Sequence, residues 1–129
     1  MANYILDKAY EVTDTGGVSA YRVVVQGTNA GQCALPGAAN ADKILGATVH
    51  AQTLQGQNVA VRKAGIARVM AAGAITLGAA VNIAGTSGKV KAVNESSGTK
   101  VFIVGFAETA ASADGDIIEV FLSFHQRTV

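Results

Sequence analysis

The chain has 129 residues and a formal net charge of +1, and only 15% of its residues are charged, against about 25% in an average soluble protein. This balance excludes the dense positive surface that nucleic-acid binding requires. No apolar run approaches the roughly 18 residues that a membrane span needs, so we expect neither a nucleic-acid nor a membrane partner. The single cysteine excludes an internal disulfide. So few charges indicate surface that faces another protein.

In chain order, the sequence predicts short strands separated by glycine-rich turns. Runs of β-branched or alternating apolar residues are typical of strands. A bend is expected at Gly46, and Asp114-Gly115-Asp116 is typical of a tight turn. The predicted strands cover residues 7–13, 21–26, 32–35, 43–51, 58–62, 65–71, 81–84, 89–93, 100–109 and 117–124. The alanines of 65–71 leave a helix as the alternative there, and the flanking glycines argue against a long one.

The last predicted strand has apolar residues on both faces. Ile118, Val120 and Leu122 share one face, which we expect to point into the core. Ile117 and Phe121 lie on the other face. This pattern indicates a strand that is covered on two sides, by the core and by a neighbour.

Two stretches of the chain, residues 20–63 and 78–121, resemble each other. Gly27-Thr28 in the first corresponds to Gly85-Thr86 in the second, and Gly46 corresponds to Gly105, at offsets of 58 and 59 residues. Two copies are too few for an open solenoid, but they can close on each other around a shared core. We therefore predict an all-β fold, a small β-barrel or β-sandwich built from two pseudo-repeated units. Residues 1–19 would form an extended N-terminal arm and first strand, and residues 20–129 a single β domain.

Candidate catalytic and metal-binding residues are few. Cys33 with His50 or His125 as base is formally possible, but nothing around Cys33 resembles a nucleophile elbow, and a buried thiol is favoured. The two histidines lack a cysteine or carboxylate cluster for a metal. Asp114 and Asp116 offer too few oxygens for calcium. We expect no enzyme activity, no cofactor and no metal.

Two groups of residues are candidates for binding a partner protein. An apolar group near the N-terminus can add to the open sheet edge of a neighbour, or it is simply the first strand. The densest basic group can face an acidic neighbour, or it is a solvated face. The candidates are Tyr4, Ile5 and Leu6 in the apolar group and Arg62, Lys63 and Arg68 in the basic group.

The order of small residues and glycines in the second half is similar to that of tailed-bacteriophage capsid cement, or decoration, proteins. The stretches that carry the resemblance are Gly65–Val69, Ala72–Val81, Gly88–Val90, Val104–Ala107 and Ala113–Val120, followed by Leu-Ser-Phe-His. The match covers about Lys43 to the C-terminus.

This resemblance implies a non-enzymatic structural virion protein, made in the host cytoplasm and located on the capsid exterior. It implies that the protein stabilises the phage head by bridging subunits of the major capsid protein. It also implies self-association, with a homotrimer favoured over a homodimer. The alternative function is a particle-displayed binding module for carbohydrate or a host surface, which would need an exposed aromatic platform.

Overall fold

The computed structural model describes residues 5–129, so Tyr4 and the part of the predicted arm before Ile5 lie outside the described residues. The described residues form strands and no helix, which confirms the all-β fold class. The strands are β1 (Leu6–Val12), β2 (Val23–Gln26), β3 (Gln32–Ala34), β4 (Ile44–Thr48), β5 (Asn58–Ala64), β6 (Ile66–Met70), β7 (Ala80–Ile83), β8 (Val90–Ala92), β9 (Lys100–Ala107) and β10 (Ile117–Thr128). Within residues 5–129 there is no helix long and apolar enough to cross a membrane.

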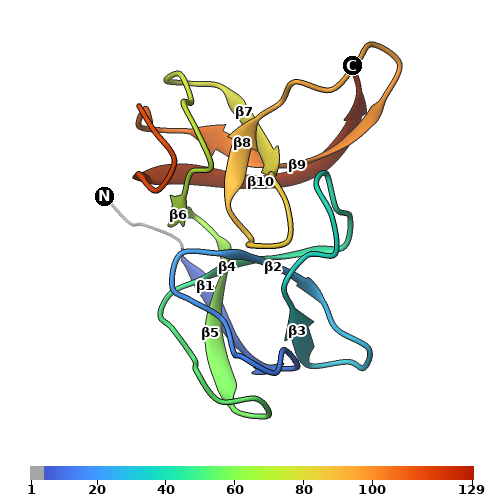
Figure 1. The fold of residues 1–129 in the computed structure, drawn as a ribbon, viewed down its shortest axis with the longest axis vertical. Helices are drawn as coiled ribbons and strands as arrows, with labels where there is room; N and C mark the ends of the chain where they lie inside the picture. The colour runs from blue at the N-terminus through green and yellow to red at the C-terminus, as the bar shows by residue number, and fades with distance from the viewer. Residues whose placement is uncertain (1–4) are drawn as a thin grey trace.

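The first half of the chain forms a closed barrel, the lower body in Figure 1. Its strand order is β1-β3-β2-β4-β5. The ring closes because β1 pairs antiparallel with β5 on one side and parallel with β3 on the other. Alternate residues of each strand point inward. Together with Val18 from the segment between β1 and β2, they build a core of Tyr10, Val12, Val24, Cys33, Leu45, Val59 and Val61. We call this body the first barrel.

The second half of the chain forms a five-stranded sheet with the corresponding order, β6-β10-β9-β7-β8. Strand β6 pairs antiparallel with β10 as β1 does with β5. An isolated parallel bridge between Ala71 and Val90 stands where the pairing of β1 with β3 closes the first barrel. We call this body the second sheet. Its interior contains Ala67, Val69, Ala71, Ile75, Val81, Ile83, Val90, Val104, Ala107, Ala111, Ile118, Val120 and Leu122.

Cross-strand neighbours in the two halves correspond at a spacing of 59 positions. Three residues side by side on β1, β5 and β4, which we call the polar row, are Asp7, Arg62 and Ala47. The residues 59 positions later, side by side on β6, β10 and β9, form the apolar row of Ile66, Phe121 and Phe106. The correspondence includes β1 and β6, which precede the similar stretches at 20–63 and 78–121.

The glycines that correspond in sequence occupy the same place in the two halves. A Cβ on Gly46 would lie 2.1 Å from the carbonyl oxygen of Arg62, and a Cβ on Gly105 would lie 2.1 Å from that of Phe121. Both distances are far below van der Waals contact, so only glycine lets the neighbouring strand approach this closely. The bend expected at Gly46 is therefore a site of close strand packing.

The two halves pack tightly against each other. Val23 and Ala47 point out of the first barrel and belong to the same apolar cluster as the interior of the second sheet. The carbonyl of Tyr21 accepts a hydrogen bond from Met70 N–H at 2.9 Å, and Val23 N–H donates to the Gly88 carbonyl at 2.8 Å. Strands β2 and β4 accordingly face the second half in Figure 1. Instead of the single shared core we expected, each half has its own cluster, because five strands already wrap around each interior.

The Asp-Gly-Asp segment forms the turn that the sequence predicts. Gly115 has a positive φ of 98°. The Asp116 carboxylate accepts hydrogen bonds from the backbone N–H groups of Ser112 at 2.8 Å and Ala113 at 3.1 Å. The N–H and hydroxyl of Ser112, together with Ala113 N–H, lower the pKa of Asp116. The side chain therefore closes the turn through local hydrogen bonds.

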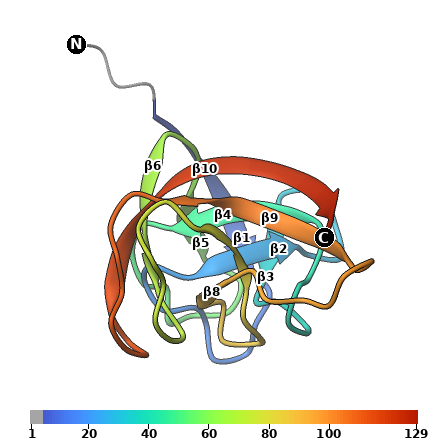
Figure 2. The same cartoon turned by 90° about the horizontal axis from the view of Figure 1, so that it is seen from above.

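Within the part of the chain that the structure describes, only one face of β10 is buried. Ile118, Val120 and Leu122 are buried, as expected. Ile117 and Phe121 are 42% and 48% exposed. Seen from above in Figure 2, β10 arches along the outside of the molecule. Within residues 5–129 nothing buries Ile117 and Phe121, and the neighbour that the sequence pattern indicated on this second face stays a prediction.

Candidate functional site

The basic residues that stand close together in the sequence point to different parts of the structure. Arg62 and Lys63 are adjacent on β5, and side chains of adjacent strand residues point to opposite faces. Lys63 Nζ donates a hydrogen bond to the Tyr10 hydroxyl at 2.8 Å and lies 5.1 Å from the centre of the Tyr10 ring. Arg62 instead lines a cleft together with Arg68. The structure thus brings two of the three predicted basic residues into one site.

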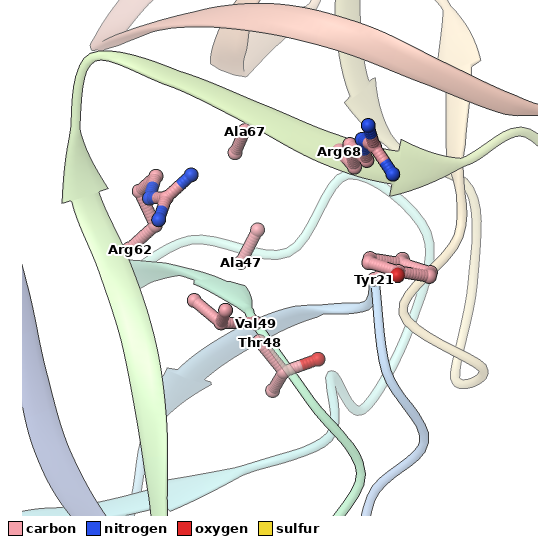
Figure 3. A pocket seen from close by; sticks show the side chains of 7 residues that line it. All are labelled: Tyr21, Ala47, Thr48, Val49, Arg62, Ala67 and Arg68. Carbon is pink, nitrogen blue, oxygen red and sulfur yellow. The ribbon is translucent and has the colours of Figure 1, made fainter. Parts of the chain in front are cut away.

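This cleft lies between β4 of the first barrel and β6 of the second sheet, and its volume is about 330 Å³. Ala47 and Ala67 face each other from the two strands in Figure 3. The short side chains of these two alanines do not fill the space between the strands. The cleft is lined by Tyr21, Ala47, Thr48, Val49, Arg62, Ala67 and Arg68.

Arg62 is held in place by contacts within the chain. Its Nε donates to Asp7 Oδ1 at 2.9 Å and its Nη2 donates to Asp7 Oδ2 at 3.2 Å, so the pair is bidentate. The hydrogen bond with Asp7 raises the pKa of Arg62 above its ordinary value. The Nη1 donates to the carbonyl of Ile66 at 3.3 Å. Arg62 therefore ties the first barrel to the start of β6, and it forms a fixed wall of the cleft.

Arg68 differs from Arg62 because its side chain is exposed and forms no ion pair among residues 5–129. It lies across the strand pair from Glu119. Figure 3 shows its guanidinium at the end of the cleft near Tyr21. Arg68 is therefore the cation in this cleft that is available to a carboxylate of a partner.

The backbone of β6 also offers hydrogen-bonding groups to the cleft. Strand β6 is at the edge of its sheet and pairs only with β10. The N–H of Met70 points away from β10 and donates to Tyr21. Because alternate residues of a strand direct their backbone groups to the same side, the N–H and C=O of Arg68 face the cleft. An extended acidic segment can pair with these groups and place a carboxylate at the Arg68 guanidinium.

Ile5 and Leu6, the described residues of the N-terminal apolar group, do not line this cleft. Leu6 begins β1 and pairs with Ala64 of β5, so this residue belongs to the first strand. The side chains of Ile5 and Leu6 are both exposed. Tyr4 lies outside the described residues. The exposed side chains remain candidates for contact with a partner.

The sequence analysis missed Ile66 and Phe106 as surface residues. Ile66 begins β6, where Ala67 and Val69 alternate as the inward residues. That alternation places Ile66 on the outer face, and it is the signal that could have identified it. Phe106 is half-buried, and its ring stacks with that of His125 at a centroid distance of 6.0 Å.

The structure does not support the nucleophilic arrangement of Cys33 with His50 or His125 as base. Cys33 is fully buried among the apolar residues of the first barrel, and burial raises the pKa of its thiol to about 11. His50 and His125 are both exposed. Within residues 5–129 there is no group of three or more His, Cys, Asp or Glu side chains placed to hold a metal ion.

Comparison with known proteins finds a similar fold. No protein-family model and no curated protein sequence matches the chain. Its fold is similar to the solved structure of the N base of the head fiber gp8.5 of bacteriophage phi29, with a TM-score of 0.64 and 17% sequence identity. The similarity covers 93% of this chain and 95% of that chain. The chain therefore folds like the N base of a phage head fiber over almost its whole length.

Proposed function

We propose that the chain is a structural virion protein that binds the outer surface of a tailed-phage head and stabilises it as a cement protein. The observation that carries the proposal is the fold, which is similar to a phage head-fiber base along nearly the whole of both chains. The glycine and small-residue pattern of the second half, which resembles cement proteins, supports the same class. The partner in this proposal is the major capsid protein.

The physical character of the molecule supports a role in holding surfaces together. Each half has its own apolar cluster, and the two halves are joined by backbone hydrogen bonds and shared packing. A body of this kind transmits force with little deformation. If it contacts several capsid subunits at once, modest contacts reinforce each other through effective concentration. The cleft with Arg68 is the place where we expect an acidic capsid segment to bind.

A second candidate function, the base of a head fiber, is favoured by the same structural relative. A fiber base must bind the capsid, but it need not strengthen the shell. A cement protein raises the resistance of the head to heat or to chelation and osmotic stress, because its contacts must break before the shell opens. Capsid binding is common to both functions, and added resistance distinguishes them.

The test uses expanded phage heads that lack the protein, mixed with the purified chain. We expect saturable co-sedimentation and release of packaged DNA at a higher temperature than from undecorated heads. Saturable binding without added heat resistance would favour the fiber base. Absence of saturable binding to these heads would contradict both candidates.

A pair of charge-reversal variants tests the cleft in the same assay. Arg68→Glu should weaken binding at least about tenfold, because it places a carboxylate where the partner carboxylate would lie. Lys100→Glu makes the same change of charge at an exposed position outside the cleft and should bind as the wild type does. Equal binding by both variants would remove the cleft from the proposal.

A further inference from the structure

The tail of β10, residues 124–128, has a neighbouring strand on one side only among residues 5–129. Strand β6 pairs with β10 from Ile117 to Phe121, and a hydrogen bond from Leu122 N–H to the Gly65 carbonyl, at 2.9 Å, follows this pairing. The chain passes from β5 into β6 through Gly65 alone, so β6 cannot extend beside the tail. Strand β9 does continue beside it. In Figure 1, β6 and the C-terminus accordingly lie at opposite ends of β10.

The free side of the tail presents unpaired backbone groups. Val129 N–H donates to the Thr99 carbonyl at 3.0 Å, which places the backbone groups of Val129 on the β9 side. Because neighbouring residues of a strand direct their backbone groups to opposite sides, the N–H and C=O of Thr128 and Gln126 point away from β9. Within residues 5–129 no strand lies beside these groups, and the residues of the tail are exposed. Such an edge is a template for pairing with another chain.

One face of the tail borders a pocket. Phe124 and Gln126 line it, together with Phe102 of β9 and Ile44 at the start of β4, and its volume is about 260 Å³. Phe102 and Gln126 lie opposite each other on the two strands, so their side chains share this face. Phe124 is 37% exposed. A strand added to the free edge would therefore place alternate side chains beside Phe124, where an apolar side chain gains from burial.

The charged groups that face the free edge and the pocket favour an acidic partner. The Arg127 guanidinium lies on the other face, 5.8 Å from the centre of the Phe106 ring, and its Nη2 donates to His125 Nε2 at 3.2 Å. Lys43 lines the pocket and is exposed. Neither cation forms an ion pair among residues 5–129, although Asp42 precedes Lys43 in the chain. A carboxylate on an added strand would pair with Arg127, whereas the tail of a second copy would bring like charges together.

We propose that the tail of β10 binds an extended acidic segment of a partner protein, which adds to the sheet as a further strand. The backbone of the segment pairs with Gln126 and Thr128. Its side chains alternate between an apolar residue beside Phe124 and a carboxylate beside Arg127. This site shares no lining residue with the Arg68 cleft. The proposal goes beyond the proposed function, because it does not require that the partner is a capsid protein.

The probe is a synthetic peptide with this alternation, Thr-Glu-Val-Glu-Val-Glu-Thr, blocked at both ends. It is titrated into the isotope-labelled full chain, and the backbone amide resonances are followed by nuclear magnetic resonance. We expect saturable shifts centred on Gln126, Arg127 and Thr128, and slower hydrogen exchange of the Gln126 and Thr128 amides. Two control peptides should bind at least about tenfold more weakly. One has lysine in place of each glutamate, and the other is N-methylated throughout the Glu-Val repeat, so that it cannot pair as a strand.

A matched pair of variants tests the edge itself. Gln126→Pro removes the N–H that faces the free side, and proline is tolerated at a strand edge because the pairing with β9 does not use that group. We expect it to bind the peptide at least about tenfold more weakly. Gln126→Ala keeps the N–H and should bind within about twofold of the wild type. Circular dichroism verifies folding, and if the proline variant does not fold, the N-methylated peptide makes the same test on the wild type.

A second pair of variants tests the charge. Arg127→Glu should weaken binding at least about fivefold, because it places a carboxylate beside the carboxylates of the peptide. Lys8→Glu makes the same change of charge at an exposed position of β1 and should bind as the wild type does.

Three results would overturn the proposal. The first is the absence of amide shifts in the tail at peptide concentrations up to about 1 mM. The second is equal binding of the N-methylated or lysine peptide. The third is self-association of the wild type that Gln126→Pro abolishes, since a second copy would then be the occupant of the edge.

Binding to phage heads is measured separately on the same proteins. A chain that binds the peptide at the tail but does not bind heads supports this proposal and contradicts the proposed function. A chain that binds heads but not the peptide contradicts this proposal and leaves the proposed function standing.

Discussion

Asn40 accepts a hydrogen bond from the backbone N–H of Phe102 at 3.0 Å, and this bond connects the loop after β3 to strand β9 of the other half. The Asn40 side chain also donates to the Lys100 carbonyl at 2.9 Å. Its backbone N–H donates to the Ile83 carbonyl at 2.8 Å. Asn40 has a positive φ of 56°, a conformation that asparagine tolerates better than most residues. One residue of the first half thus binds two strands of the second.

The first prediction concerns this connection. Asn40→Ala removes the side-chain hydrogen bonds and places alanine at a positive φ, so we expect the free energy of unfolding to fall by about 2–4 kcal/mol. Asn40→Gly removes the same bonds but tolerates the backbone conformation, so it should lose less. Asn29→Ala, at an exposed asparagine, is the control and should have little effect. Urea unfolding measures all three, and an Asn40→Ala variant as stable as the control would contradict the prediction.

The second prediction concerns the paired glycines. Gly105→Ala would place a Cβ 2.1 Å from the Phe121 carbonyl oxygen, and β9 and β10 would have to separate. We expect a loss of about 1–3 kcal/mol, the usual range for overpacking. A similar loss is expected for Gly46→Ala, beside Arg62. Gly37→Ala has no atom within 4 Å of the new Cβ and should be close to neutral. Thermal unfolding of the three variants measures these losses of stability. A destabilising Gly37→Ala together with a neutral Gly105→Ala would contradict the prediction.

The third prediction concerns the buried thiol. Burial in the first barrel, with a smaller contribution from Asp14, raises the pKa of Cys33 from 9.0 to about 11. The Cys33 thiol therefore keeps its proton to a higher pH in the folded protein than in the unfolded chain. Stability from this group is complete below pH 9.0 and is lost as the pH rises from 9.0 to about 11, by at most about 3 kcal/mol.

Cys33→Ala provides the comparison, because it removes the ionising group. The decrease in the free energy of unfolding between pH 8.5 and 10.5 should be smaller in this variant than in the wild type. In the native wild type at neutral pH, the thiol should react with iodoacetamide only as fast as the protein unfolds. Rapid alkylation of the folded protein would show that Cys33 is accessible.

The fourth prediction concerns Glu95. Burial acts to raise the pKa of Glu95, but hydrogen bonds from Lys91 and Asn82 outweigh it, and the pKa is lowered. Lys91 Nζ donates at 2.8 Å, and the amide of Asn82 donates to both carboxylate oxygens at 3.2 Å. The stabilisation is therefore present above the ordinary pKa of 4.5 and lost as the pH falls below it.

We expect Glu95→Gln to lower the free energy of unfolding at pH 7 by about 2 kcal/mol, the scale of hydrogen bonds to a charged group. At pH 3 the difference from the wild type should be smaller, because protonation of the wild-type carboxyl removes this stabilisation as the pH falls below 4.5. Glu108→Gln, at an exposed carboxylate, serves as the control with a small effect at both pH values. A Glu95→Gln variant whose deficit is the same at pH 3 and pH 7 would contradict this account.

Local patterns predicted the strands and turns well. The alternation of Ile118, Val120 and Leu122 marked the buried face of β10, and the structure buries all three. The Asp-Gly-Asp turn and the spacing of Gly46 and Gly105 are also confirmed. These features depend on side-chain alternation and on backbone freedom, which act over a few residues.

The candidate site was predictable only in part. The sequence grouped Arg62, Lys63 and Arg68 as one basic spot, but the structure ties Lys63 to Tyr10 and Arg62 to Asp7. Arg68 remains available because its side chain is exposed and forms no ion pair among residues 5–129. Partners separated by more than 50 residues in the chain cannot be read from local spacing.

The sequence by itself determined that this chain is all-β and that its halves correspond, because periodicity and glycine placement are encoded locally. Only the tertiary structure decided which of two corresponding rows is covered. Both rows occupy the same backbone positions, but the second sheet buries Ala47 of one row, whereas the corresponding Phe106 of the other row is only half-buried. The reason is physical: burial depends on where the two halves lie in space, and that placement is fixed by contacts between residues far apart in the chain.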